Sequence, residues 1–319
     1  MTLFSIMIFD VASARTAFPI LALVFFDINS RLFLPGTNDS ARSYWYALCI
    51  GLPHITSFIS SPILCSISDR VGRKPLLALA LFGTTLAGLV ISFAVLYGNV
   101  YLLMTGMLIS GVFARANPLA QAVVGDSDIG HQKISAMGWL QCFIAVGALI
   151  GPIVGGHIAK WHFAQLNFSA AFFLGTLFGF LGLLLTVFLF KESLTHKSTR
   201  TSFGLIIKSF GLFRNKQIAA LSIILFCSQI TWSMYYQYIS PMLKVNLSFS
   251  ASAIGLFVGL IALWLVFASS YGLSFLKRFC SLHQCVMTGL YLELTGSVIA
   301  IVGFYFHAAP IVWLSALPV

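Results

Sequence analysis

The sequence predicts an all-α polytopic membrane protein, and three observations support this prediction. Of the 319 residues, 59% are hydrophobic and 8% are charged, whereas a soluble domain carries about 25% charged residues. Apolar runs long enough for a membrane-spanning helix, about 20 residues, recur along the chain. Between these runs, Lys and Arg gather in every second loop, the pattern that orients a protein in a bilayer. Lipid is therefore expected to be the main solvent.

The apolar runs predict nine complete spans. No basic segment or small-residue cleavage site marks the first run as a removable leader, so it is expected to stay as a helix. A tenth run begins near Ala309 and continues to Val319. The nine spans are Leu3–Phe26, Ser43–Cys65, Pro75–Tyr97, Val100–Val124, Ile134–Ile158, Phe168–Phe190, Gln217–Ser240, Ser250–Phe275 and Gln284–Phe306.

The basic residues predict how these spans are oriented. Twelve Lys and Arg lie in one set of loops and four lie in the alternate set. Because basic loops stay in the cytoplasm, the N-terminus is expected on the inner side of a cell inner membrane. The +10 net charge then needs no nucleic acid, since no basic face carries interleaved aromatic residues.

A polar, basic segment after the sixth span divides the chain. The prediction is a six-helix N-terminal half at 1–190, a cytoplasmic linker at 191–216 and an incomplete C-terminal half at 217–319. The protein is expected to be a monomer in the lipid bilayer.

The most informative motif lies between the second and third spans, where residues 66–77 read SISDRVGRKPLL. Gly72 permits a tight turn among the charges, and Pro75 suits the first turn of the next helix. The motif resembles the cytoplasmic loop between helices 2 and 3 of the major facilitator superfamily, whose pattern is Gly-x-x-x-Asp-Arg-x-Gly-Arg-Lys/Arg. Cys65 stands at the first glycine of that pattern, and the matching residues are Asp69, Arg70, Gly72, Arg73 and Lys74.

This resemblance implies a major facilitator fold of two six-helix halves, and a secondary transporter that works by alternating access. The family has twelve spans, and this chain supplies fewer than ten complete ones. A truncated product, a partial chain and a remnant that works by other means therefore all stay open as interpretations.

A second motif lies in the fifth span, which reads GALIGPIVGG. Glycines every four residues form a smooth stripe that lets another helix approach closely, and the proline bends the helix. The run resembles the antiporter signature of proton-coupled drug exporters, which favours export over uptake. Its members are Gly147, Gly151, Pro152, Gly155 and Gly156.

The first and fourth spans add to this similarity. Asp10 precedes Pro19 by nine residues, as in tetracycline and multidrug exporters, and Arg15 stands where that subgroup often has glycine. Asp126 resembles the acidic end of the fourth helix in the same exporters. The resemblance implies a cytoplasmic cluster of Asp69, Arg73 and Asp126 that latches one face closed; a solvated surface cluster is the alternative.

Ionisable side chains inside spans are the candidates for proton coupling. They are costly in lipid, so they are functional candidates by default. Asp10 and Glu293 are the candidate proton carriers, because a carboxyl group away from water exchanges protons more readily near neutral pH. Arg115 either shares a cavity with Asp10 or extends its head to the membrane surface.

Aromatic and amide side chains indicate a cavity for an amphipathic organic molecule, although aromatic stripes also serve packing. The sequence carries no HExxH, GxSxG or GxxxxGK[ST] pattern, so we expect no enzyme activity, cofactor or metal. The predicted cavity residues are Arg15, Asn117, Gln121, Gln229, Trp232, Tyr235 and Tyr236.

The function predicted from the sequence is proton-coupled export of a drug or similar small organic compound. Two alternatives remain open. One is an uptake facilitator for a metabolite, sugar or siderophore, and the other is a truncated membrane remnant that transports nothing.

Overall fold

The computed structural model describes residues 1–27, 30–33, 36–114, 116–126, 133–159, 168–194, 215–268, 273–276 and 279–317. Every regular element within these ranges is a helix. Eight of the described helices are long and apolar enough to cross a membrane, which confirms the predicted all-α membrane fold. Residues 195–214, most of the predicted linker, lie outside the described ranges.

The described elements follow the predicted spans closely. Within the predicted span Ser250–Phe275, helix α11 ends at Phe267 and is one of the shorter apolar helices, and residues 269–272 lie outside the described ranges. The elements are α1 (Thr2–Thr16), α2 (Phe18–Phe26), α3 (Asp39–Val71), α4 (Arg73–Tyr97), α5 (Val100–Phe113), α6 (Ala116–Asp126), α7 (Lys133–Ile158), α8 (Ser169–Phe188), α10 (Lys216–Leu247), α11 (Ala251–Phe267), α12 (Leu273–Leu276), α13 (Leu282–Tyr305) and α14 (Ala309–Ser315).

Two spans that the sequence predicts as continuous are divided beside prolines. The first is interrupted at Ala17, and Pro19 lies in the first turn of α2. The fourth ends its first segment at Ala114, four residues before Pro118. Proline has no N–H for the carbonyl four positions earlier, and its ring clashes with that carbonyl. The interruption therefore falls where the proline predicts it.

Two buried clusters organise the packing at opposite ends of the helices. We call the charged motif at residues 66–77 the clip, and the end of the molecule that carries it the clip end. The cluster there contains Ile6, Leu77 and Leu140, and all its buried members come from residues 3–190. The cluster at the opposite end contains Tyr46 and Leu243, so it joins α1–α8 to α10–α14. Apolar burial thus connects the two groups of helices at the end opposite the clip.

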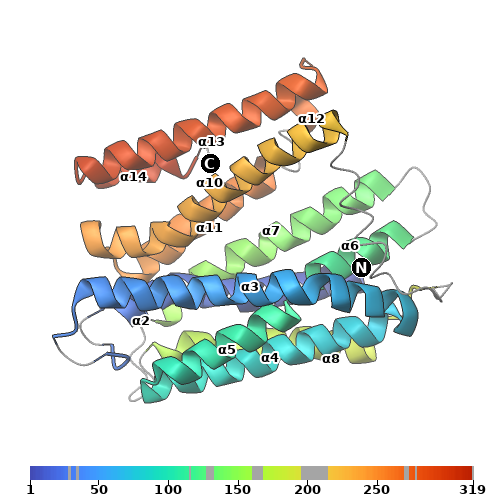
Figure 1. The fold of residues 1–319 in the computed structure, drawn as a ribbon, viewed down its shortest axis with the longest axis horizontal. Helices are drawn as coiled ribbons and strands as arrows, with labels where there is room; N and C mark the ends of the chain where they lie inside the picture. Colours follow the sequence, from blue (N-terminus) through green and yellow to red (C-terminus); the bar gives the residue numbers. More distant parts are fainter. Residues whose placement is uncertain are drawn as a thin grey trace.

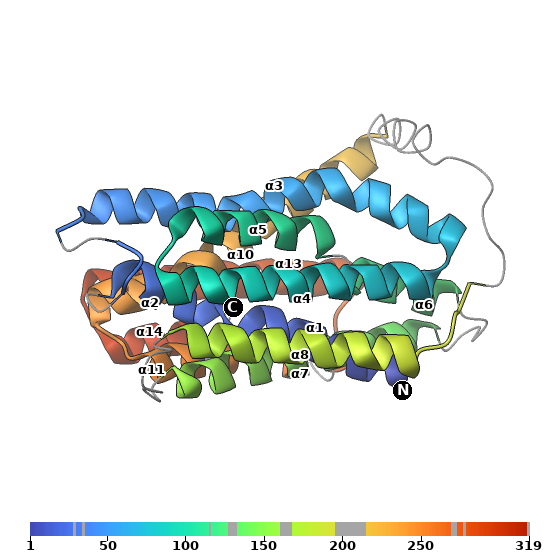
Figure 2. The same ribbon diagram turned by 90° about the horizontal axis from the view of Figure 1, so that it is seen from below.

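The ribbon shows this arrangement directly. Helices α10–α14 lie on one side and α3, α4 and α5 on the other (Figure 1). Turned by 90°, the structure shows α3, α4 and α8 running along the long axis (Figure 2). Helix α7 packs against α1 and also against α11, so it connects the first group of helices to the second.

Candidate functional site

At the clip end, one buried arginine gathers the predicted charge cluster. Arg73 is 7% exposed, and its Nη1 and Nη2 lie 2.7 Å from Asp69 and 2.8 Å from Asp126. Its Nη1 also donates a hydrogen bond of 2.8 Å to the hydroxyl of Ser68. These contacts tie the α3–α4 turn to the end of α6. All three partners belong to α3 or α6, so these contacts of Arg73 stay within helices α1–α8.

A carboxylate that the sequence did not single out completes this cluster. Glu192 accepts hydrogen bonds from the backbone N–H groups of Arg73 at 2.9 Å and Lys74 at 3.1 Å, which are free donors at the start of α4. Burial opposes its ionisation, but backbone hydrogen bonds from Leu194, Arg73, Lys74 and Ser193 lower the pKa of Glu192. A negative charge at a helix N-terminus is also favoured by the helix dipole.

The turn itself depends on glycine. Gly72 has φ +129°, a backbone conformation that L side chains rarely adopt, and a Cβ there would lie 3.1 Å from Cδ of Glu192. Of the other predicted clip residues, Lys74 is bound through its backbone, and Arg70 has a buried Nε without a hydrogen-bond partner in the described structure.

The glycine motif of α7 packs on two helices. A Cβ on Gly147 would lie 2.6 Å from the carbonyl oxygen of Ile8, and one on Gly151 would lie 2.8 Å from that of Ala12. Gly155 meets the carbonyl of Thr16 in the same way. This stripe therefore brings α7 into backbone contact with α1.

The other side of the motif faces α11. A Cβ on Gly156 would lie 2.7 Å from the carbonyl oxygen of Ala251 and 3.2 Å from Cα of Gly255. A Cβ on Gly255 would in turn meet the carbonyl of Pro152. The motif thus joins helices far apart in the sequence.

Polar contacts between the two groups lie at the end opposite the clip. Lys244 Nζ lies 2.6 Å from Oδ2 of Asp27, and both side chains are largely buried. The hydroxyl of Tyr46 donates a hydrogen bond of 3.0 Å to the carbonyl of Gln237, whose Nε2 lies 3.1 Å from Nε2 of His54. The sequence analysis missed the Asp27–Lys244 pair; its signal is an isolated charge at the end of each span.

An aromatic cluster surrounds Arg15 between the same two groups. The guanidinium carbon of Arg15 lies 4.6 Å from the ring centroid of Tyr236 and 5.9 Å from that of Phe18. Tyr236 stacks on Phe18 at 4.7 Å and on Trp232 at 5.6 Å. The structure therefore brings together three of the predicted cavity residues, and it adds Phe18.

The predicted proton carriers lie on separate helices. Glu293 in α13 lies against the backbone of Trp232, and its Oε1 is buried with no hydrogen-bond partner among the described residues. Asp10 lies on α1, where its backbone nitrogen faces Gly182 of α8. Arg115 lies outside the described residues.

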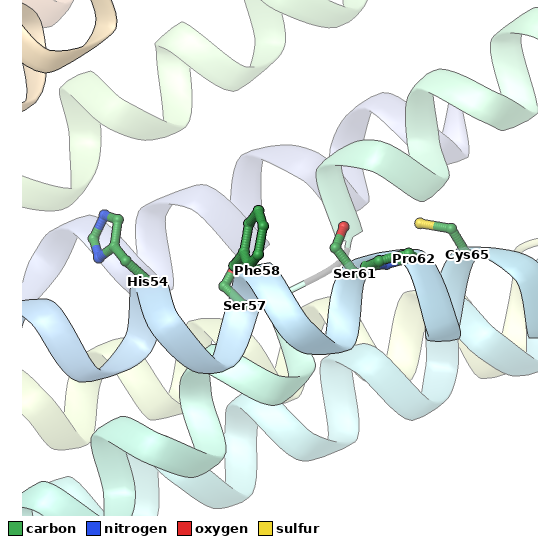
Figure 3. A pocket seen from close by; sticks show the side chains of 6 residues that line it. All are labelled: His54, Ser57, Phe58, Ser61, Pro62 and Cys65. Atoms are coloured by element: carbon green, nitrogen blue, oxygen red, sulfur yellow. The ribbon is translucent and has the colours of Figure 1, made fainter. Parts of the chain in front are cut away.

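The remaining predicted cavity residues do not join this cluster. Gln121 donates a hydrogen bond of 2.9 Å to Asn117 on the same helix, and Gln229 is exposed. The hydroxyl of Tyr235 lies 3.1 Å from that of Ser315, on α14. An open pocket of about 580 Å³ lies elsewhere, along one face of α3 (Figure 3); its lining residues are His54, Ser57, Phe58, Ser61, Pro62 and Cys65.

Comparison with known proteins agrees with these features. The chain is 26% identical over 221 residues to a tetracycline resistance protein, class B, from Escherichia coli, a match covering 66% of this chain and 53% of that protein. It is 27% identical over 210 residues to a multi-drug resistance efflux pump from Streptococcus pneumoniae, covering 66% and 50%. The chain thus spans about half the length of the curated relatives it matches.

Solved structures share the fold at low sequence identity. A D-xylose-proton symporter superposes with a TM-score of 0.71 at 16% identity, covering 99% of this chain and 77% of that one. A human organic anion transporter superposes with a TM-score of 0.70 at 16% identity, and the match covers 99% of this chain and 80% of that one. The family model described as Major Facilitator Superfamily matches residues 3–318. Together with the helices and the clip, this match shows that the chain belongs to the major facilitator superfamily.

Proposed function

We propose that this protein exports a drug or another small organic compound in exchange for protons, by alternating access. The relatives named for tetracycline resistance and multi-drug efflux support this choice of substrate class. The proposal places the clip end in the cytoplasm and assigns residues 1–190 and 217–319 to the two moving halves.

The observation that carries the proposal is the position of Glu293. The proposal is supported by two observations: Oε1 of Glu293 is buried without a described hydrogen-bond partner, and the carboxyl group lies against the backbone of Trp232, a member of the aromatic cluster between the two groups of helices. A change of charge there would alter the cost of bringing the groups together, because moving a carboxylate out of water costs more free energy than moving a neutral carboxylic acid. Asp10 is the second proposed carrier. The cluster of Asp69, Arg73 and Asp126 would hold the clip end of the first half in shape during the movement.

The test is transport in proteoliposomes that contain the purified protein, with tetracycline and ethidium as probes. We expect a proton gradient to drive accumulation, and Glu293→Gln or Asp10→Asn to lower the driven rate at least about tenfold. Asp39→Asn is the matched control, since Asp39 is an exposed carboxylate at the start of α3. Proton-independent equilibration would favour the facilitator, and no flux of either probe would contradict the transport proposal.

A further inference from the structure

Arg15 lies near the middle of the candidate membrane span Thr2–Phe26, where its guanidinium group lies beside rings from both groups of helices. Its Cβ would lie 2.9 Å from a Cβ on Gly151, so the base of the side chain packs on the glycine stripe of α7. Its guanidinium carbon then lies 4.6 Å from the centroid of Tyr236, which belongs to α10. A cation over an aromatic face is stabilised by the ring quadrupole, and more strongly where water is excluded.

No described carboxylate neutralises Arg15. The sequence has eight acidic residues, of which Asp128 lies outside the described ranges. The ion pairs found among the others involve Arg73 and Lys244. Asp10 lies five positions before Arg15 on α1; at 3.6 residues per turn the two side chains leave the helix about 140° apart. Arg15 thus has a charge without a described counter-charge.

Arg42 is a useful comparison, because its guanidinium group has hydrogen-bond acceptors in the described structure. Its guanidinium carbon also lies over an aromatic ring, 5.6 Å from the centroid of Phe33. In addition, its Nη1 donates to the carbonyl of Phe25 at 3.1 Å, and its Nε donates to that of Thr37 at 3.3 Å. No such acceptor faces Arg15 among the described residues, so the directional N–H donors of its guanidinium are available to a ligand.

We infer that Arg15 selects substrates that carry an anionic group, and that the preferred substrate is a planar organic carboxylate. A carboxylate matches the guanidinium fork with two parallel hydrogen bonds. The rings of Trp232 and Tyr236 beside it would receive the apolar, planar part of the molecule. This inference rests on the proposed function as a carrier of small organic compounds, and it narrows the class to organic anions.

Equilibrium binding tests this inference separately from transport. The purified full-length chain in detergent is dialysed against 2-naphthoate or 2-naphthamide, which share one ring system and differ in charge, and binding to protein-free micelles is subtracted. We expect the native protein to bind the carboxylate about tenfold more tightly than the amide. Arg15→Gln should abolish this preference and leave amide binding within about threefold, and Arg15→Lys should keep part of it.

Arg42→Gln is the matched control and should keep the full preference. Equal affinity of the native protein for the two probes, binding of neither, or a preference that survives Arg15→Gln would overturn the inference. The native ratio alone decides if the variant does not fold. Loss of proton-driven flux with the carboxylate preference intact would instead count against the proposed function and leave this inference standing.

Discussion

Glu192 shows how one distant side chain can complete a local turn. It binds the first N–H groups of α4 from a position 119 residues beyond Arg73. We predict that Glu192→Gln lowers the free energy of unfolding by about 1 kcal/mol, because the amide loses the negative charge and one of the two acceptor oxygens at the start of α4. The measurement is the denaturant midpoint of the purified protein in detergent at pH 7.

The stability that Glu192 contributes should decrease at acidic pH. Because the folded pKa of Glu192 lies below its ordinary value of 4.5, its contribution is complete above pH 4.5 and is lost as the pH falls through the folded pKa. The native protein should therefore lose stability in that acidic range, and the variant should lose less. Lys191→Gln, at the exposed neighbouring position, is the control. Parallel pH profiles for native protein and Glu192→Gln would contradict the assignment.

Helix α7 packs between two other helices, since its glycines contact α1 on one side and α11 on the other. We predict that Gly151→Ala destabilises the protein by about 1–3 kcal/mol, because its Cβ would lie 2.8 Å from the carbonyl of Ala12 and the backbone cannot move aside. Thermal unfolding in detergent measures the effect.

The same helix supplies the control for this prediction. A Cβ on Gly138 meets nothing within 4 Å, so Gly138→Ala should be neutral or stabilise the helix by up to about 1 kcal/mol. Gly156→Ala should instead loosen the contact between α7 and α11. Equal unfolding temperatures for Gly151→Ala and Gly138→Ala would show that the close approach does not matter.

At the scale of the whole molecule, sequence patterns predicted features formed by neighbouring residues, but they missed contacts between residues far apart in the sequence. Apolar length predicted the spans, and the clip residues predicted the turn at Gly72. The break before Pro118 follows from proline chemistry and could also have been predicted. The Asp27–Lys244 pair joins residues 217 positions apart: a sequence read alone shows an isolated charge near the end of each span, but it does not show that these two charges pair.

The same distinction applies to the predicted cavity residues of the candidate site. The sequence predicts Arg15, Trp232 and Tyr236 as cavity residues, and they do lie together. It also predicts Asn117 and Gln121, but their side chains hydrogen-bond to each other. Residue type therefore identifies candidates, while the packing of α2 against α10 decides which of them share a site.

That packing closes the molecule at the end opposite the clip. The reactivity of a native buried thiol can measure how often this end opens. Cys49 has no exposed surface and belongs to the buried cluster that contains Tyr46 and Leu243. If the Asp27–Lys244 pair holds this end together, Asp27→Asn or Lys244→Gln should open it more often. A loss of 1–2 kcal/mol, typical of a removed interaction, raises the open population about five- to thirtyfold.

Alkylation of Cys49 by a membrane-impermeant maleimide, in protein whose other five cysteines are serine, measures this opening as a rate. The rate should rise about five- to thirtyfold in either single variant, since the reagent reaches the thiol only in the open state. It should return toward the native value when Asp27→Lys and Lys244→Asp are combined, because the swapped charges can pair again. Arg31→Gln removes an exposed charge at the same end and should leave the rate unchanged. An unchanged rate in both single variants would mean that apolar packing around Tyr46 closes this end without help from the ion pair.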